Sequence, residues 1–283
     1  MLPGSLLDQE RAMAEHESNL TDEEQQQVED HAPPPAKVVH ASVSKQGDDE
    51  LDRPLGSLFW SAVAAGIAIM ASLWIGGALH HYTPEAPWRE AIVALGYPFG
   101  FLIVVLGRMQ LFTEQTVVAI LPLAREKTAR NFGRVARLWS IVFLGNVVGT
   151  AFMAALAAYA HLQSDEVLGG MLAVAGKLEE HTALETMTLG IPAGFIMASV
   201  AWIRSAEDQF GFWIVVALTA AIGLGGFTHV VVGSAEAWLL VWKGEAGLGW
   251  LLGGFLAPAL AGNVIGGTGL LALLAHAQVR QEI

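Results

Sequence analysis

Six apolar stretches follow one another along the chain after residue 54, separated by short polar segments. The uninterrupted stretches each exceed about 20 residues, the length that a helix needs to cross a hydrocarbon core about 30 Å thick. The pattern therefore predicts an all-α membrane protein with six transmembrane helices. The six stretches cover residues 55–80, 91–123, 135–160, 183–203, 210–242 and 250–276.

The second and fifth stretches are each interrupted near the middle. In the fifth, Gly225 and Gly226 loosen the helix just before His229, the only titratable group at that depth. In the second, Gly107 precedes a corresponding break at residues 112–113. Non-helical backbone at membrane depth is tolerated only where protein or a water-filled cavity satisfies it. Two such interruptions at corresponding positions indicate a transport site, and the alternative is a kinked helix whose histidine bonds to a neighbour.

The two halves of this region repeat each other. Segment 145–150 returns as 262–267, 117 residues later, and the two breaks lie 115 residues apart. Because three spans is an odd number, we expect the second copy to be inverted, so that the two broken helices meet near the midplane. The glycines of both segments let helices approach closely. Asn146 and Asn263 are expected to bond across helices or to backbone freed at the breaks.

Composition agrees with a membrane protein and excludes several functions. The 283 residues are 53% hydrophobic and only 15% charged, with a mean hydropathy of +0.48. Without cysteine there is no disulfide, thiolate metal site or cysteine nucleophile. The net charge of −12 comes mostly from the first 54 residues, so nucleic acid is not expected as a partner.

That acidic N-terminal segment has few aliphatic residues, and we expect it to be a largely disordered tail. Thr21 and Glu24 are spaced to cap one short helix within it. An inert, solvated extension and a regulatory segment are both compatible with this composition. The expected domains are a tail at 1–54, a six-span domain at 55–276 with halves at about 55–161 and 182–276, and a C-terminal segment at 277–283.

Basic residues predict the orientation of the chain. They crowd the connection between the second and third stretches, whereas the opposite side carries few. The positive-inside rule places this connection, the N-terminal tail and the C-terminus in the cytoplasm. The five residues of the basic connection are Arg125, Lys127, Arg130, Arg134 and Arg137.

Several motifs occur in an order and spacing that resemble the formate/nitrite transporter family over about 220 residues. The resemblance implies an aquaporin-like protomer, a homopentamer in an inner (cytoplasmic) membrane, and a channel for small monovalent anions such as formate and nitrite. It implies neither an enzyme nor a cofactor. The motifs are residues 97–101, Gly107, 111–113, 145–149, 225–229 and 262–267.

The same resemblance assigns the pore residues. His229 matches the family's central histidine, and Thr113 matches the threonine that faces it. Apolar side chains on the first broken helix fall where the family builds a constriction, and Ile222 falls at a second constriction. Ordinary core packing is the alternative at each apolar position. The constriction residues on the first broken helix are Tyr97, Phe101, Leu111 and Phe112.

This sequence also departs from the family pattern. Arg108 and Glu114 flank the first break and Glu236 follows the second, where the resemblance leads one to expect neutral residues. Intramembrane charges are costly and are candidates for function, so they either tune the pore or form a structural pair. Two positions where the family usually has asparagine are Gly194 and Gly233 here. A divergent branch of the family is therefore expected.

The favoured mechanism is a pore for weak-acid anions in which His229, bonded to Thr113, shares a proton with the anion. Imidazole suits this exchange because its ordinary pKa of about 6.5 lies near working pH. A channel for water, glycerol or ammonia would use a similar architecture, and a non-conducting scaffold is a further alternative. A membrane enzyme or metal site is disfavoured, because the short His and Glu clusters at residues 80–81 and 179–181 lack partners at ligand spacing.

Overall fold

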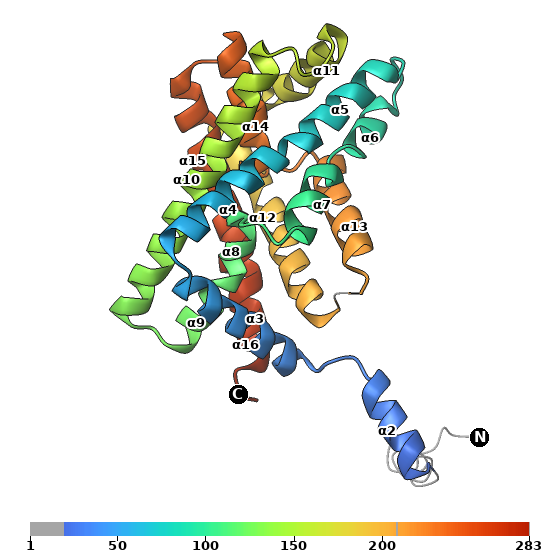
Figure 1. Cartoon of the computed structure of the whole chain (residues 1–283), viewed down its shortest axis with the longest axis vertical. Helices are drawn as coiled ribbons and strands as arrows, with labels where there is room; N and C mark the ends of the chain where they lie inside the picture. Colours follow the sequence, from blue (N-terminus) through green and yellow to red (C-terminus); the bar gives the residue numbers. More distant parts are fainter. Residues whose placement is uncertain (1–19, 208, 283) are drawn as a thin grey trace, which may run out of the picture. The chain divides into compact units, whose positions relative to one another are not determined.

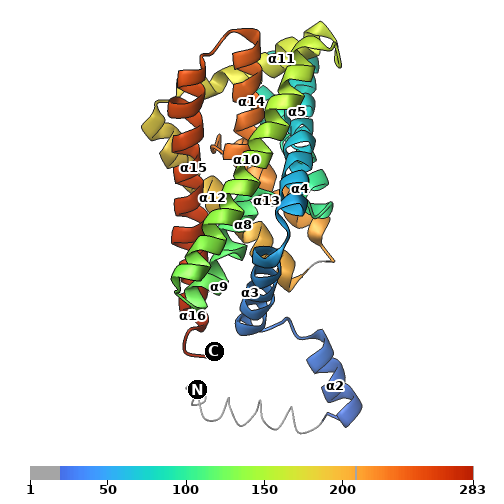
Figure 2. The same cartoon turned by 60° about the vertical axis from the view of Figure 1, so that its left-hand side comes forward.

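The computed structural model of the protein describes residues 20–207 and 209–282, which form helices and connecting turns with no strand among them. The chain separates into two units, residues 1–35 and residues 36–283. All elements from α3 onward belong to the second unit and are shown in Figures 1 and 2.

The first unit contains one described helix, α2 (Asp22–His31). Thr21 and Glu24 cap its start as the sequence predicts. The Thr21 backbone N–H and hydroxyl donate to Glu24 Oε2 at 2.8 and 2.9 Å, and the Glu24 N–H donates back to Thr21 Oγ1 at 3.3 Å. This reciprocal pair is a capping box, and it confirms the predicted short helix. The expected disorder of residues 1–19 lies outside the described residues.

Helix α3 (Ala36–Asp52) corrects the expectation of a tail that extends to residue 54. Val39, Val43 and Leu51 are buried where α3 packs against other helices of the second unit. The acidic residues of α3 are met by the basic connection, where Arg125 pairs with Asp48 at 2.9 Å. The segment is ordered because the burial of apolar residues at helical spacing and the pairing of its charges offset the entropy lost on ordering. The average composition of residues 1–54 does not show this local pattern.

The first half of the second unit runs from the end of that unit that carries α3 to the opposite end and back. Its long helix α10 lies against α4, and α11 lies at the end opposite α3 (Figures 1 and 2). The helices are α4 (Leu55–Ala68), α5 (Met70–Tyr82), α6 (Arg89–Ala94), α7 (Pro98–Leu106), α8 (Phe112–Val118), α9 (Ile120–Arg125), α10 (Ala129–Tyr159) and α11 (Asp165–Gly176).

The second half repeats this plan with α12 in the place of α4 and the last helical stretch in the place of α10. Helix α12 begins with another capping box, formed by Thr182 and Glu185. The final stretch is continuous from Trp250 to Val279, and its turns alternate between α and wider π geometry. The elements are η1 (Lys177–Glu180), α12 (Ala183–Ala206), α13 (Gly211–Leu224), α14 (Val230–Lys243), η2 (Trp250–Leu256), α15 (Ala257–Val264), η3 (Ile265–Ala272) and α16 (Leu273–Val279).

By length and composition, five helical stretches of the described chain can cross a membrane. They match five of the six expected spans, whereas the stretch expected at 210–242 forms two helices, α13 and α14, with a non-helical turn between them. Of these, Gly211–Leu224 is apolar but shorter. The five long stretches are Leu55–Tyr82, Arg89–Leu106, Ala129–Tyr159, Ala183–Ala206 and Trp250–Val279.

Glycines allow the same close helix crossing in each half. A side chain at Gly149 of α10 would collide with the Val63 carbonyl of α4, and one at Gly266 of η3 would collide with the Ile191 carbonyl of α12. Gly194 has the same role, because a Cβ there would strike the backbone of Asn263. These glycines therefore set the interhelical distance in both halves, as the sequence predicts for small residues in membrane helices.

Candidate functional site: two helix breaks and the cavities beside them

The two non-helical segments, residues 107–111 and 225–229, have the same backbone hydrogen bonds. In the first, Met109 N–H donates to the Val104 carbonyl at 2.9 Å. In the second, Phe227 N–H donates to the Ile222 carbonyl at 3.1 Å. Equivalent residues of the two segments, such as Met109 and Phe227, therefore lie 118 positions apart in the sequence. The register of 115 expected from the paired Phe-Thr sequences is therefore wrong by three residues.

In the correct register, Leu111 is equivalent to His229. Leu111 stands at the start of α8 and His229 at the start of α14. The two Phe-Thr pairs therefore do not occupy equivalent positions, and what the two halves share at the breaks is the path of the backbone. Backbone hydrogen bonds define that path, and a comparison of the two amino-acid sequences does not show them.

One asparagine holds each break in place. Asn146 Oδ1 accepts the Phe112 N–H at 2.9 Å, and Asn146 Nδ2 donates to the Gln110 and Ala62 carbonyls, both at 2.8 Å. Both asparagine side chains are fully buried. Asn146 thus bonds both to backbone freed at the first break and, across helices, to the Ala62 carbonyl of α4.

Asn263 repeats this arrangement in the second half. Its Oδ1 accepts the Val230 N–H at 2.9 Å, and its Nδ2 donates to the Thr228 carbonyl at 2.8 Å and the Gly190 carbonyl at 2.9 Å. Each amide thus satisfies one N–H and one carbonyl of a break, which the helices cannot pair, and its second N–H donates to a carbonyl of a neighbouring helix, α4 or α12.

His229 and Thr113 come together from the two halves. The distance between Thr113 Oγ1 and His229 Nε2 is 2.8 Å, and both side chains are buried, with 0% and 1% of their surface exposed. His229 Nδ1 accepts the backbone N–H of Val232 at 3.2 Å and so caps α14. Because Nδ1 is an acceptor, the proton of the neutral ring is on Nε2, which donates to Thr113. The Thr113 hydroxyl hydrogen is then left for another acceptor.

A row of aromatic rings leads to this pair. Tyr97 and Phe101 have ring centroids 5.4 Å apart, and the Phe101 ring meets His229 edge-on at 5.0 Å. Phe112 is not in the row. Its ring packs against Trp139 and Phe143 of α10, at 5.6 and 5.3 Å.

Leu111 is also fully buried and lines neither of the two cavities described below. Of the residues that the sequence assigned to the first constriction, Phe101 therefore lies against His229, Tyr97 lies against Phe101, and Phe112 packs against α10.

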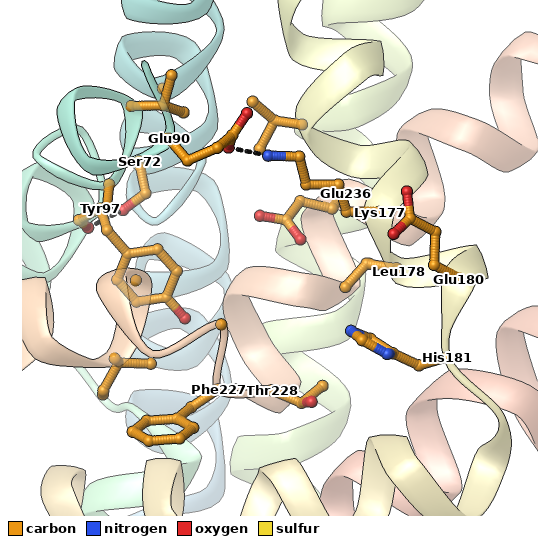
Figure 3. A pocket seen from close by; sticks show the side chains of 17 residues that line it. Ser72, Glu90, Tyr97, Lys177, Leu178, Glu180, His181, Phe227, Thr228 and Glu236 are labelled. Carbon is orange, nitrogen blue, oxygen red and sulfur yellow. Dashed lines mark hydrogen bonds and ion pairs between the residues drawn. The ribbon is translucent and has the colours of Figure 1, made fainter. Parts of the chain in front are cut away.

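A cavity of about 250 Å³ lies at the end of the molecule that carries η1, and we call it the η1 cavity (Figure 3). Tyr97 and Glu236 point into it from different walls, and Phe227 and Thr228 of the second break form another part of its lining. Ile222 lines it as well. Lys177 forms an ion pair with Glu90 at its edge, shown by the dashed line in Figure 3.

A second cavity, of about 600 Å³, lies at the end that carries α3, and we call it the α3 cavity. Its lining includes Arg108 and Glu114 beside the first break and Arg204 of α12. Helix α3 supplies a further part of the wall, including Glu50, and Arg53 lines the cavity just after the end of that helix. Arg108 and Glu114 are thus in the same cavity, whereas Glu236 is in the η1 cavity.

Backbone geometry accounts for the glycines of the breaks. Gly226 has a φ of 60°, the left-handed region that glycine adopts without strain. At Gly225 an added Cβ would run into the Phe227 ring, at 2.6 Å from its nearest atom. Gly107 has an ordinary φ of −74° and ends α7. Arg108, the equivalent of Gly226, has a φ of 51° despite its side chain.

Three polar residues that link α3 to the first break were not identified from the sequence. Glu50 Oε2 accepts from Gln110 Nε2 at 2.9 Å, and Gln110 Oε1 accepts from Gln115 Nε2 at 2.9 Å. The available signal was two glutamines within an apolar stretch, on either side of Leu111 and Phe112. Thr228, next to His229 in the chain, also lines the η1 cavity and was not predicted as a pore residue.

Comparison with known proteins gives a consistent result. The formate/nitrite transporter family model matches residues 37–277, beginning inside α3. The inner membrane protein YfdC of Escherichia coli (strain K12) is 36% identical over 255 residues, which are 90% of this chain and 82% of that protein.

Two solved structures share the fold at 17% sequence identity. One is a pentameric formate channel with formate bound, with a TM-score of 0.68 over 80% of this chain and 98% of that one. The other is an FNT family ion channel, with a TM-score of 0.72 over 86% of this chain and 98% of that one. Because the family match spans most of the sequence and the fold agrees with it, the chain belongs to the formate/nitrite transporter family.

Proposed function

We propose that this protein is a channel for small monovalent weak-acid anions of the formate and nitrite type, which cross its apolar centre as the neutral acid. The observation that carries the proposal is the buried hydrogen bond between His229 and Thr113. Each of the two residues is the chain neighbour of a residue that lines a different cavity, Thr228 in one case and Glu114 in the other. Family membership and the likeness to a formate-bound channel support the choice of substrate.

The surroundings of this pair favour a neutral form of the permeant. Phe101 and Ile222 are fully buried near it. An ion transferred into such an apolar environment loses its hydration without compensation, whereas a neutral acid loses far less. Hydrated cations and anions of strong acids, which cannot take up a proton near neutral pH, should therefore be rejected.

His229 supplies the polar centre of the path. In the resting state its Nδ1 caps α14 and its Nε2–H donates to Thr113, so the threonine hydroxyl can donate to an oxygen of the permeant. We therefore propose that the acid HA, on reaching Thr113, passes its proton to Nδ1 as the bond between Nδ1 and the Val232 N–H opens. This gives the anion A⁻ beside a doubly protonated ring. The ring then returns a proton to A⁻, the cap bond closes again, and HA moves on as the neutral acid.

The proposed setting is the inner (cytoplasmic) membrane, with α3 and the C-terminus on the cytoplasmic side. The basic connection supports this orientation by the positive-inside rule. Single cysteines at Lys127 and Leu162 test it, because both residues are exposed and the native chain has no cysteine. A membrane-impermeant thiol reagent added to intact cells should label the Leu162→Cys protein and not the Lys127→Cys protein. The opposite labelling would reverse the orientation.

We also propose a homopentamer, with a separate pore in each protomer. A pentameric channel of similar fold supports this assembly. Large apolar side chains remain exposed on the described chain, such as Trp60 at 69% and Trp213 at 66%, as expected for surfaces that face lipid or other copies. Native mass spectrometry from mild detergent should show five copies. A stable monomer or tetramer would contradict the proposal.

Variants at His229 test the role of the imidazole in proteoliposomes. His229→Phe should abolish formate flux without changing assembly, because it removes both ring nitrogens. His229→Asn should keep conduction, since asparagine also caps helices well, but it cannot titrate near neutral pH. The pH dependence of its maximal rate should therefore be flat. A maximal rate whose pH profile matches that of the wild type would show that the imidazole is not the titrating group.

A further inference from the structure

The η1 cavity contains three polar side chains that have no hydrogen-bond or ion-pair partner within the described part of the chain: the Glu236 carboxyl, the Tyr97 hydroxyl and the Thr228 hydroxyl. Glu236 is 8% exposed and Thr228 is 5% exposed. Tyr97 is half-buried, and the polar groups of all three side chains are accessible from the cavity and not sealed inside the protein. They are therefore available to bind a small polar molecule there. All three line one cavity of about 250 Å³, which is suited to a molecule much smaller than a drug.

The charges around this cavity are predominantly acidic. Glu90 and Lys177 form an ion pair and offset each other. Glu180 and Glu236 are the remaining carboxylates of the lining, and His181 is its imidazole. An anion that entered while Glu236 was ionised would meet a like charge across a partly desolvated space, which is unfavourable. An anion that arrived with one proton would not.

We infer that the η1 cavity is a binding site that takes the permeant anion together with one proton, which Glu236 holds, while Tyr97 and Thr228 bond to the oxygens of the anion. This inference rests on the proposed function and adds the group that supplies the proton. The proton cannot come from the resting His229, whose Nδ1 accepts the Val232 N–H and whose ring therefore carries a single proton. Glu236 is a buried carboxyl of the cavity that, within the described part of the chain, forms no hydrogen bond or ion pair, although the charge of Lys177 acts on it across the cavity.

The proton transfer is balanced in both directions. During entry from the η1 end, an anion A⁻ binds beside the protonated Glu236, and the O–H bond of the carboxyl breaks as the proton moves to A⁻. The products are the neutral acid HA and the Glu236 carboxylate. HA moves on past the second break, and Glu236 takes a new proton from the solution on its side. One proton therefore accompanies each anion, and the reverse sequence describes exit.

The groups facing Glu236 come from several elements. The chain segment just before α7 contributes Tyr97, η1 contributes Lys177 and Glu180, and α6 contributes Glu90. Helices α5 and α11 also pack against α14, but they bring only Ser72, Gly76 and Val174 to the lining. Glu236 is thus the titratable residue that α14 itself places in the cavity.

Glu236→Gln separates binding from proton supply. Glutamine resembles the protonated carboxyl in shape and charge but has no proton to give. In wild-type proteoliposomes, the apparent KM for formate should rise about tenfold per pH unit above the titration of the site, since binding takes up one proton. In Glu236→Gln, the KM should stay low and independent of pH, whereas kcat should fall at least tenfold. Glu179→Gln is the matched control, because Glu179 is exposed and does not line the cavity.

Two outcomes would overturn the inference, and a third would refute the proposed function. A Glu236→Gln protein with the pH-dependent KM of the wild type would remove Glu236 as the proton site and leave the proposed function standing. Methylammonium uptake that requires Glu236 would show that the site takes a cation. No flux of any anion through the wild type would instead refute the proposed function itself.

A second measurement covers the case in which Glu236→Gln does not fold. Formate is added to His229→Asn protein in weakly buffered detergent solution, and a pH indicator follows the protons. At a pH above the titration of the site, where the empty site is unprotonated, uptake of one proton per chain is expected, because Glu236 remains. No proton uptake under formate binding would overturn the inference.

Discussion

Replacing Asn263 with leucine removes three buried hydrogen bonds while nearly conserving side-chain volume. The Val230 N–H and the Thr228 carbonyl lose their partner, and the Gly190 carbonyl, which lies inside helix α12, loses its second donor. At about 0.6 kcal/mol each, a typical value inside membrane proteins, the three bonds give a lower limit of about 2 kcal/mol. Because the Val230 N–H and the Thr228 carbonyl stay buried and unpaired, each of these two is expected to cost about 1 kcal/mol or more. The predicted destabilisation is therefore about 2–5 kcal/mol.

The measurement is unfolding of the purified protein in mixed micelles of rising denaturing-detergent fraction, followed by loss of helical circular dichroism. Asn146→Leu should cost a similar amount, because Asn146 makes the equivalent three bonds in the first half. Thr268→Val is the control, since it removes one side-chain bond, to the Thr116 carbonyl at 2.6 Å, and should cost about 0.5–1.5 kcal/mol. An Asn263→Leu protein within 0.5 kcal/mol of the wild type would refute the view that these amides hold the breaks.

Two further predictions concern α3 and the second break. Burial, and then the neighbouring His276 and Arg125, lower the pKa of His40 in docked α3. The docked state therefore binds fewer protons than the undocked state, and docking should be strongest above about pH 6.5 and weaken as the pH falls below it. Hydrogen exchange of the α3 amides, corrected for intrinsic rates, should speed up between pH 7.5 and 5.5 in the wild type and not in His40→Gln; equal protection at both pH values would contradict this. Gly226→Ala should destabilise the protein by about 1–2 kcal/mol in the same unfolding assay, because Gly226 has a positive φ. Gly133→Ala in α10 is the control: a Cβ there meets open space, so this change should be neutral or slightly stabilising.

The helical class was predicted from local sequence patterns, whereas the pairing of Thr113 with His229, which the structure places 2.8 Å apart, was expected from the family resemblance. Long apolar stretches indicate helices in a membrane, and glycines before a polar residue indicate a break. The roles of Asn146 and Asn263 were also predicted in kind, since a buried amide in an apolar helix needs polar partners.

Other features depend on tertiary structure and could not be predicted from the sequence. The register of the two breaks is fixed by backbone hydrogen bonds, so the matching Phe-Thr letters gave 115 where the structure has 118. Phe112 turns toward Trp139 because Asn146 holds its backbone N–H against α10. The order of α3 depends on partners about 80 residues away, such as Arg125 for Asp48, which composition alone does not show.

The central claim is that a weak-acid anion crosses this protein with a proton. It is tested most directly by following formate and proton entry together in proteoliposomes that hold an internal pH indicator, with glycerol as the neutral comparison. The account predicts formate uptake that acidifies the interior by one proton per anion and no faster glycerol entry than in protein-free vesicles. Rapid glycerol entry without formate uptake, or formate uptake without acidification, would contradict it.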